Sequence, residues 1–260
     1  MGSLRSNAPR NLRVEPMRVR IGCCGFPIAR KKYFANLSVV EIQKTFYEPP
    51  SPDVARKWKN EAPEDFEFTI KAWQIITHES TSPTYKRLSI ELTQSQRKQV
   101  GSFKLNDMTY MGWQRTLEIA RILGANKVLF QCPASFLPTS ENKKRMKSFF
   151  KEIPRKGIFC IWEPRGDWKT EEIAQICKEL NLVHCVDPFI ADEVTTGLIY
   201  WRLHGIGDYR HRYSDDELES LKDKLMQRIG KSQRCEAYIF FNNLSMWDDS
   251  LRLKQMLEKP

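Results

Sequence analysis

Charged side chains recur near the carboxyl ends of otherwise apolar segments of this chain. The clearest cases are Glu41, Lys71, Glu163, Arg202 and His204, each within or directly after a run of β-branched and aromatic residues. Removing an unpaired charge from water costs several kcal/mol, so charges in such positions are expected to be paired or to line a wet site. Carboxylates and a histidine beside cations suit general acid–base chemistry on an anionic substrate.

Each of these residue types has an expected role. Glu41 and Glu163 are the candidate general base and acid, and His204 fits either role because imidazole titrates near neutral pH. Three cations, together with five further groups, are expected to bind the substrate and its phosphate: Lys71, Arg165, Arg202, Gln43, His78, Gln131, Tyr213 and Asn242. The cations would clamp a phosphate and stabilise charge that develops in a transition state.

The same carboxylates offer a second chemistry, that of a metal site. Glu41, Glu163 and Asp187, with His204 as a fourth ligand, present the oxygen-rich set that one Mg²⁺ or Mn²⁺ ion prefers. The chain has only four histidines, so a histidine-rich site is not expected. A zinc or iron–sulfur site is not expected either, because strand parity points Cys132 and Cys160 outward to the helices and Cys185 inward.

A purely structural interpretation exists for several of these residues. Glu163 and Arg165 fit an ion pair, Asp187 fits a turn cap before Pro188, and Gln131 fits a partner for backbone groups. Polar residues nevertheless end seven successive apolar segments, and this joint occurrence favours a pocket.

Eight short apolar segments must position these side chains. Their length and their β-branched and aromatic content are typical of strands in a parallel sheet that is covered on both faces. They span residues 18–24, 39–46, 66–73, 127–133, 158–165, 182–188, 199–205 and 236–243. Amphipathic segments with helix-start signals lie between them, such as Ser51-Pro52 and the capping box Ser214–Glu217. This order predicts a TIM-type (β/α)₈ barrel, with an open doubly wound sheet as the alternative.

Two connections depart from the regular pattern. The sixth crossover, residues 189–198, is too short for a full helix. Residues 74–112 separate the third strand from its helix, which is expected to begin near Trp113, and this loop far exceeds the usual ~2–6 residues. Its segment 94–104 carries three cations and no acid. A loop of this length is usually a functional lid or a flexible insertion.

Charge and composition limit the domain organisation and the partners. Residues 1–16 are interpreted as a mobile basic tail and residues 17–260 as a single barrel domain. The 42 Lys and Arg residues against 32 Asp and Glu give a formal net charge of +10, which favours an anionic small molecule or nucleic acid as partner. No apolar window approaches the ~18 residues that span a bilayer, and the amino terminus lacks a signal-peptide core. A cytoplasmic location without a membrane partner is therefore expected.

The segments IGCCGF, VVEIQKTFYEPPSPDVARKW, FEFTIKAWQIITH, FQCPASF, IWEPR, WRLHG and FFNN occur in this order. They resemble the domain of unknown function 72 family, also called YecE-like proteins, over residues 18–255. The most specific signal is a glutamate-containing strand that runs into TFY and then SPxxxxxW. The pair Cys23-Cys24 departs from the Thr-Ser or Thr-Cys expected there. The resemblance implies a TIM barrel and no established activity.

Two classes of function remain open. The first is a hydrolase or lyase that acts on a phosphate-bearing anionic substrate, nucleic acid included, at the carboxyl-end rim of the barrel. The alternative is a non-catalytic module that binds a nucleotide, a sugar phosphate or RNA at the same rim.

Overall fold

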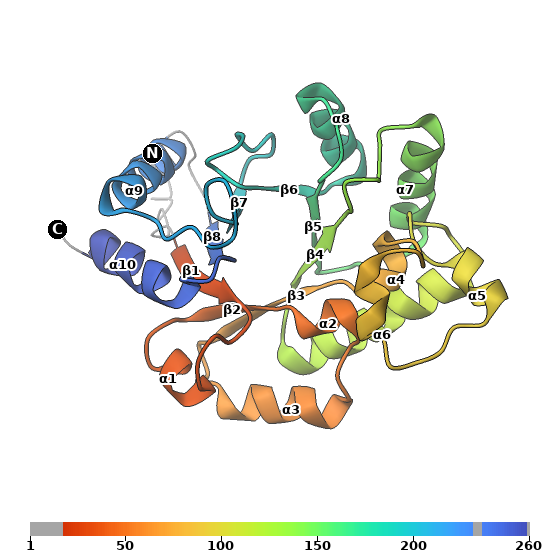
Figure 1. Cartoon of the computed structure of the whole chain (residues 1–260), viewed down its shortest axis with the longest axis horizontal. Coiled ribbons are helices and arrows are strands. Elements are labelled where there is room, and N and C mark those ends of the chain that lie inside the picture. The colour runs from red at the N-terminus through yellow and green to blue at the C-terminus, as the bar shows by residue number, and fades with distance from the viewer. Residues whose placement is uncertain (1–17, 231–235, 259–260) are drawn as a thin grey trace, which may run out of the picture.

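A closed barrel of eight parallel strands forms the centre of the molecule, which a computed structural model describes over residues 18–230 and 236–258 (Figure 1). The strands are β1 (Arg18–Cys24), β2 (Val39–Ile42), β3 (Glu67–Lys71), β4 (Lys127–Gln131), β5 (Phe159–Glu163), β6 (Val183–Val186), β7 (Leu198–Leu203) and β8 (Glu236–Phe241). Strand β1 pairs with β8 from Arg18 opposite Glu236 to Cys23 opposite Phe241, and this pairing closes the sheet. The predicted (β/α)₈ barrel is confirmed, and the open sheet is wrong. The expected tail, residues 1–16, lies outside the described residues.

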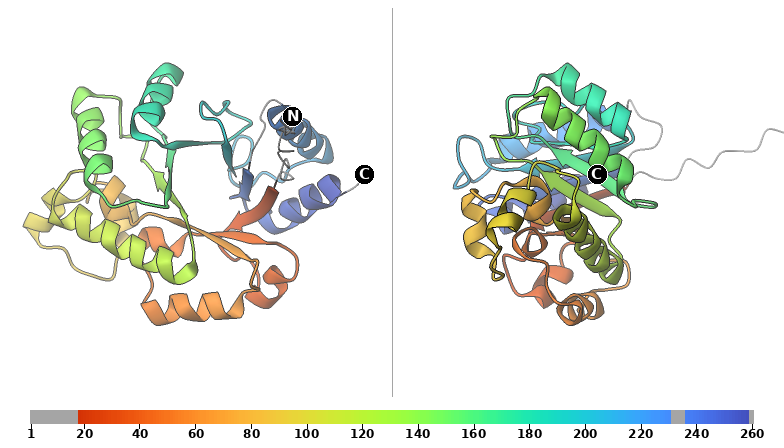
Figure 2. Two further views of the ribbon diagram at one scale, coloured as in Figure 1. Left: turned by 180° about the vertical axis from the view of Figure 1, so that it is seen from behind. Right: turned by 90° about the vertical axis from the view of Figure 1, so that its right-hand side faces the viewer.

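Helices surround the strands on the outside of the barrel (Figure 2). They are α1 (Arg30–Phe34), α2 (Lys44–Tyr47), α3 (Pro52–Glu61), α4 (Gln74–Thr77), α5 (Gln94–Gln99), α6 (Asp107–Leu123), α7 (Ser140–Glu152), α8 (Thr170–Leu180), α9 (Asp215–Gly230) and α10 (Met246–Glu258), with a 3₁₀ helix η1 (Pro83–Arg87). The capping box predicted before α9 is present, because Ser214 Oγ accepts the Glu217 N–H at 3.2 Å and Glu217 Oε2 accepts the Ser214 N–H at 2.7 Å.

Alternate residues of each strand point into the barrel and fill it. The interior cluster contains Cys24, Val39, Leu129, Ile161, Cys185, Leu198, Tyr200, Tyr238 and Phe240. At the amino end of the strands, Glu67 lies 2.7 Å from Arg20 Nε and accepts the Tyr238 hydroxyl at 2.5 Å. These contacts fill the amino end, so the polar residues at the strand carboxyl ends lie at the opposite rim.

Two element boundaries differ from those that the sequence predicts, and one connection agrees. Strand β2 ends at Ile42, so Gln43 lies in a turn before α2 and is not part of a strand. Helix α6 begins at Asp107, before the expected Trp113, because the Asn106 side chain accepts the backbone N–H groups of Met108 and Thr109 and so caps the helix. The connection between β6 and β7, residues 187–197, is fully described and contains no helix, as its length predicted.

The long connection after β3 runs over residues 72–106 and contains α4, η1 and α5. Gly101, Ser102 and Phe103 all have positive φ angles, and their N–H groups donate to the carbonyls of Ile75, Thr77 and Ile76 in α4. The loop is thereby folded back on α4, beside the end of β3. Within the described ranges, no helix is long and apolar enough to cross a lipid bilayer.

Candidate active site at the carboxyl ends of the strands

Arg202 on β7 lies at the centre of the barrel mouth and joins two carboxylates. Its Nη1 lies 2.5 Å from Glu163 Oε2, and its Nη2 lies 3.0 Å from Glu41 Oε1. All three side chains are buried, with Arg202 only 1% exposed. Burial opposes charge on the guanidinium, but the neighbouring acidic groups hold the pKa of Arg202 well above its usual value. Sequence analysis placed Arg202 among the phosphate contacts, whereas its donors here are directed to carboxylates.

Glu41 is enclosed by donors. The Tyr200 hydroxyl donates to its Oε2 at 2.7 Å, the Cys24 thiol donates to its Oε1 at 3.3 Å, and the Gln43 amide donates to the same oxygen. Its side chain has no exposed surface. The arrangement suits a fixed counter-charge for Arg202 better than a base that must reach a substrate. Tyr200 and Cys24 were absent from the predicted site, although Tyr200 precedes Arg202 by two residues and therefore shares its face.

The partly exposed side chains of the cluster are Arg165 and His204, which contact the second oxygen of buried Glu163. Arg165 Nη2 lies 2.9 Å from Glu163 Oε1 and 2.5 Å from His204 Nε2, and His204 Nε2 lies 3.5 Å from Glu163 Oε1. The Arg165 side chain is 35% exposed and that of His204 is 19% exposed. Burial acts to raise the pKa of Glu163, but Arg202 and Arg165 outweigh it and hold that pKa at about 2. Glu163 is therefore ionised near neutral pH.

Asp187 fixes the position of His204. Its Oδ2 accepts the His204 backbone N–H at 2.9 Å and lies 3.5 Å from His204 Nδ1, while its Oδ1 accepts the Phe189 N–H at 3.1 Å. His204 Nε2 faces the guanidinium groups of Arg165 and Arg202, which can only donate. Neutral His204 must then carry its proton on Nδ1, toward Asp187.

Lys71 is the buried cation of this rim without a carboxylate partner among the described residues. Its ammonium donates to Gln131 Oε1 and lies 3.8 Å from the centre of the Phe46 ring. Burial is the main cause that lowers the pKa of Lys71 to about 7; Arg202 acts in the same direction, and Glu163 and Glu41 act against it. His78 packs edge-on against the same ring at 4.9 Å, and burial with the Lys71 charge lowers its pKa to about 3. Phe46 was missed because no strand parity places it at the rim.

Strand register links Lys71 to the acidic cluster. Lys71 pairs with Leu129 on β4, and Gln131, two residues later on β4, pairs with Glu163 on β5. Lys71, Gln131, Glu163 and Arg165 therefore follow one another across three adjacent strands at the rim.

The predicted contact Tyr213 is not brought into this cluster. Tyr213 is 1% exposed, stacks on Phe189 at 5.3 Å, and its hydroxyl accepts the Gly205 N–H at 2.9 Å. It anchors the loop after β7 from the outer core. For Asn242, the hydrogen bond at this rim is that of its backbone N–H, which donates to the Leu203 carbonyl at 2.7 Å.

The predicted metal ligands do not converge. No group of three His, Cys, Asp or Glu side chains within residues 18–230 and 236–258 is arranged to hold a metal ion. The reason is that Arg202 occupies the space between Glu41 and Glu163, while Asp187 lies beyond His204. The expected Mg²⁺ or Mn²⁺ site on Glu41, Glu163 and Asp187 is corrected accordingly.

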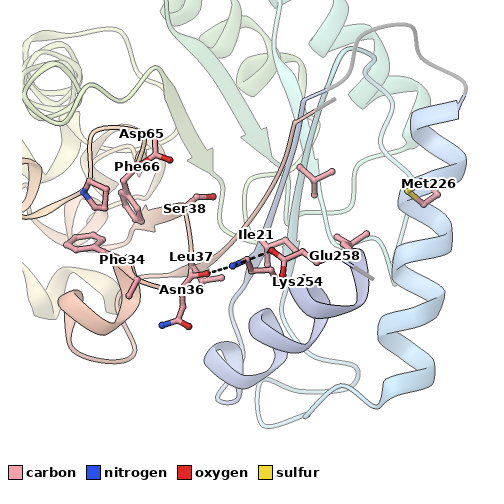
Figure 3. Close-up of a pocket in the computed structure, with 14 residues that line it drawn as sticks. Ile21, Phe34, Asn36, Leu37, Ser38, Asp65, Phe66, Met226, Lys254 and Glu258 are labelled. Carbon is pink, nitrogen blue, oxygen red and sulfur yellow. Dashed lines mark hydrogen bonds and ion pairs between the residues drawn. The ribbon is translucent and has the colours of Figure 1, made fainter. Parts of the chain in front are cut away.

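A cavity of about 550 Å³ lies at the opposite end of the strands (Figure 3). Its walls come from the start of β1, the end of α1, α9 and α10, and they are lined mainly by apolar groups such as Ile21, Phe34 and Phe66. Lys254 crosses it, donating to the Asn36 carbonyl at 2.9 Å and lying 3.5 Å from Glu258. The charged side chains of the barrel rim are not among the residues that line this cavity.

The chain matches one protein family and several related proteins. The family described as protein of unknown function DUF72 matches residues 29–259. UPF0759 protein YunF from Bacillus subtilis strain 168 is 27% identical over 264 residues, which cover 87% of this chain and 84% of YunF. These matches confirm the resemblance that the motifs carry.

Solved structures show the same fold. A DUF72 family protein from Thermotoga maritima superposes with a TM-score of 0.69 at 19% identity, covering 93% of this chain and 100% of its own. Endonuclease IV from Thermus thermophilus superposes with a TM-score of 0.53 at 11% identity, covering 92% and 97% of the two chains. At these identities the likeness concerns the barrel alone.

Proposed function

This chain belongs to the DUF72 family of proteins of unknown function, and we propose that it is a hydrolase or lyase acting on a phosphate-bearing anionic substrate at the carboxyl-end rim of its barrel. The observation that carries the proposal is the position of Arg165. Its guanidinium is one-third exposed and lies within 3 Å of both His204 and Glu163. A phosphate drawn to Arg165 would therefore lie beside an oriented imidazole and a carboxylate.

The buried network supports this role for Arg165. Glu41 and Glu163 together carry two negative charges against the one positive charge of Arg202, and Arg165 adds the second positive charge. A bound dianion would be attracted by Arg165 and by Lys71 when that side chain is protonated. Arg202 acts as a positioning residue, because its contacts fix Glu163 without reaching the solvent.

The difference between the shifted pKa values of the titratable groups in the site supports catalysis rather than binding alone. Glu163 has its pKa lowered to about 2 and Lys71 has its pKa lowered to about 7, so the rim combines an ionised carboxylate with an amine that exchanges protons near neutral pH. Groups tuned in this way are typical of acid–base sites. His204 supplies a second proton carrier once substrate draws Arg165 away from its Nε2.

One observation favours the alternative, a non-catalytic module that binds a nucleotide, sugar phosphate or RNA. In this structure the His204 Nε2 lone pair already accepts hydrogen bonds from Arg165 and Arg202. If it keeps both contacts with ligand bound, it has no proton acceptor to offer, and the rim would only bind.

A phosphate titration tests the shared anion site without assuming a substrate. Inorganic phosphate added to ¹⁵N-labelled protein is expected to shift the His204 and Arg165 side-chain resonances, and Arg165→Ala is expected to abolish the shift. Arg145→Ala is the matched control, since Arg145 is 31% exposed and also pairs with a glutamate, at 2.9 Å. Equal shifts in both variants would reject the site.

Turnover then separates enzyme from binder. Sugar phosphates, phosphodiesters and oligonucleotides would be screened with wild-type protein, His204→Asn and Glu163→Gln. An activity that both variants lose supports the enzyme. Phosphate binding without turnover of any of these classes would favour the binding module.

A further inference from the structure

We propose that Lys71 is a covalent nucleophile that forms an imine with a carbonyl group of the substrate, so that the substrate class is a phosphate-bearing aldehyde or ketone. The inference rests on the proposed function and deepens it. Lys71 was expected to clamp phosphate, but Arg165 is better placed for that task. Its side chain is only 6% exposed, whereas Arg165 is exposed at the same rim.

The surroundings of Lys71 favour a neutral amine. No carboxylate lies within ion-pair distance of Lys71 in the described part of the chain, and its one hydrogen-bond partner is the neutral amide of Gln131. Phe46 covers it on one side, and the fixed positive charge of Arg202 acts on it from the barrel centre. A lysine that is desolvated beside another cation is activated as a nucleophile, because the amine loses its proton near neutral pH.

Other buried lysines do not share this environment. Lys127, at the amino end of the barrel, is equally enclosed but lies 3.6 Å from Glu67 and 3.8 Å from Glu236. Burial lowers the pKa of Lys127 as well, but these two carboxylates oppose the shift. Lys71 is thus distinguished by the absence of such a partner and by its place at the rim that carries Arg165 and His204.

The chemical step balances without a further reactant. The lone pair of neutral Lys71 Nζ bonds to the carbonyl carbon while the C=O π electrons move to oxygen. One amine proton passes to that oxygen, which takes a second proton from solvent and leaves as water. The product is a protonated imine, and its positive nitrogen withdraws electrons from the neighbouring carbon. Loss of a proton or of a leaving group from the substrate then becomes easier, which is the chemistry of a lyase.

Pyridoxal 5′-phosphate followed by sodium borohydride is the direct probe, since it combines an aldehyde with a phosphate and the hydride converts an imine to a stable secondary amine. Peptide mass spectrometry of full-length protein treated near pH 7 is expected to find Lys71 modified at least about tenfold faster than the exposed Lys144. Lys71→Met protein that unfolds cooperatively should lose only this modification.

Two comparisons separate this inference from the proposed function. Pyridoxal, which lacks the phosphate, should react more slowly at Lys71, and inorganic phosphate should protect Lys71 from pyridoxal 5′-phosphate. If Lys71 reacts fast but without phosphate preference or protection, the nucleophile stands and the phosphate site is overturned. If phosphate shifts Arg165 and Lys71 reacts no faster than Lys144, the imine is overturned and the phosphate site stands. If neither occurs, both proposals are overturned.

Discussion

Arg202 Nη1 and Glu163 Oε2 lie 2.5 Å apart inside the barrel, in a position that solvent does not reach. The contact leaves the other oxygen of Glu163 facing Arg165 and His204 at the rim. One carboxylate therefore belongs both to the core and to the candidate site. We therefore expect a substitution of Arg202 to lower the free energy of unfolding first and to alter the chemistry of the site only as a consequence.

Replacing Arg202 should unfold the protein more easily. Arg202→Met leaves two buried carboxylates without their guanidinium, and breaking a buried ion pair in this way typically costs about 3–5 kcal/mol. Urea unfolding near pH 7 measures the free energy of unfolding. Arg145→Ala removes an exposed pair on α7 and should cost less than about 0.5 kcal/mol. A loss below about 1 kcal/mol in Arg202→Met would show that the two carboxylates are not held by this guanidinium.

The contribution of ionised Glu163 to the free energy of unfolding should disappear in acid. Its pKa is about 2 in the folded protein and near 4.5 in the unfolded chain, so the ionised carboxylate stabilises the fold above about pH 4.5. That contribution is lost as the pH falls from about 4.5 toward 2. The stability difference between wild type and Glu163→Gln should accordingly be largest near neutral pH and shrink below about pH 4.5. A difference that stays constant down to about pH 3 contradicts the lowered pKa.

The proton of neutral His204 should reside on Nδ1. Nitrogen-15 NMR of histidine-labelled protein distinguishes the tautomers, and the chain has only four histidines to assign. His204→Asn identifies the signal, and Asp187→Asn should shift His204 toward a mixture, because the carboxylate 3.5 Å from Nδ1 is lost. An Nε2–H tautomer in the wild-type protein would be incompatible with the donors of Arg165 and Arg202 that face this atom.

Gly101 should be needed to fold the long loop back beside Lys71. Its φ is +85°, and an added Cβ would lie 2.5 Å from the Glu79 backbone nitrogen, so Gly101→Ala adds a backbone clash to conformational strain. A cost of about 2 kcal/mol or more is expected, with faster hydrogen exchange over residues 72–106. Gly157 has a similar φ of +78° but nothing within 4 Å of its Cβ position. Gly157→Ala should therefore cost only about 1 kcal/mol, and equal costs would contradict the clash.

Much of this arrangement follows from local sequence pattern. Strand parity alone places Glu41, Lys71, Gln131, Glu163 and Arg202 in the barrel mouth, because successive strand residues alternate between the interior and the helices. Parity also predicts that the cysteine of β6, Cys185, points inward, and it does. The pattern fails where a strand ends early, as at Gln43, since the start of α2 after Ile42 depends on tertiary contacts.

What the sequence cannot supply is which charges neutralise one another. Arg202 has the inward strand position and the positive charge expected of a residue that binds phosphate. Only the closed barrel brings Glu41, from β2, into contact with it. The same closure separates Asp187 from the other two carboxylates and so removes the expected metal site. Lys71 differs from the other cations for the same reason, because its lack of a carboxylate partner is a property of the assembled rim.

Because Lys71 has no carboxylate partner in the assembled rim, its charge should lower the free energy of unfolding by a measurable amount. Its pKa is about 7 in the folded protein and near 10.5 in the unfolded chain, so between these pH values the unfolded chain binds more protons and wild-type stability rises with pH. Lys71→Met removes the cost, and near pH 7 it should raise the free energy of unfolding by about 1–3 kcal/mol. The gain should narrow as the pH approaches about 10. Lys127→Met is the matched control: burial lowers the pKa of Lys127 too, but Glu67 and Glu236 oppose that shift, so this substitution should gain less stability than Lys71→Met. A destabilised Lys71→Met variant would mean that Lys71 is a structural cation with sufficient partners. A stabilised variant that no longer reacts with pyridoxal 5′-phosphate would show that Lys71 is kept for chemistry at the expense of stability.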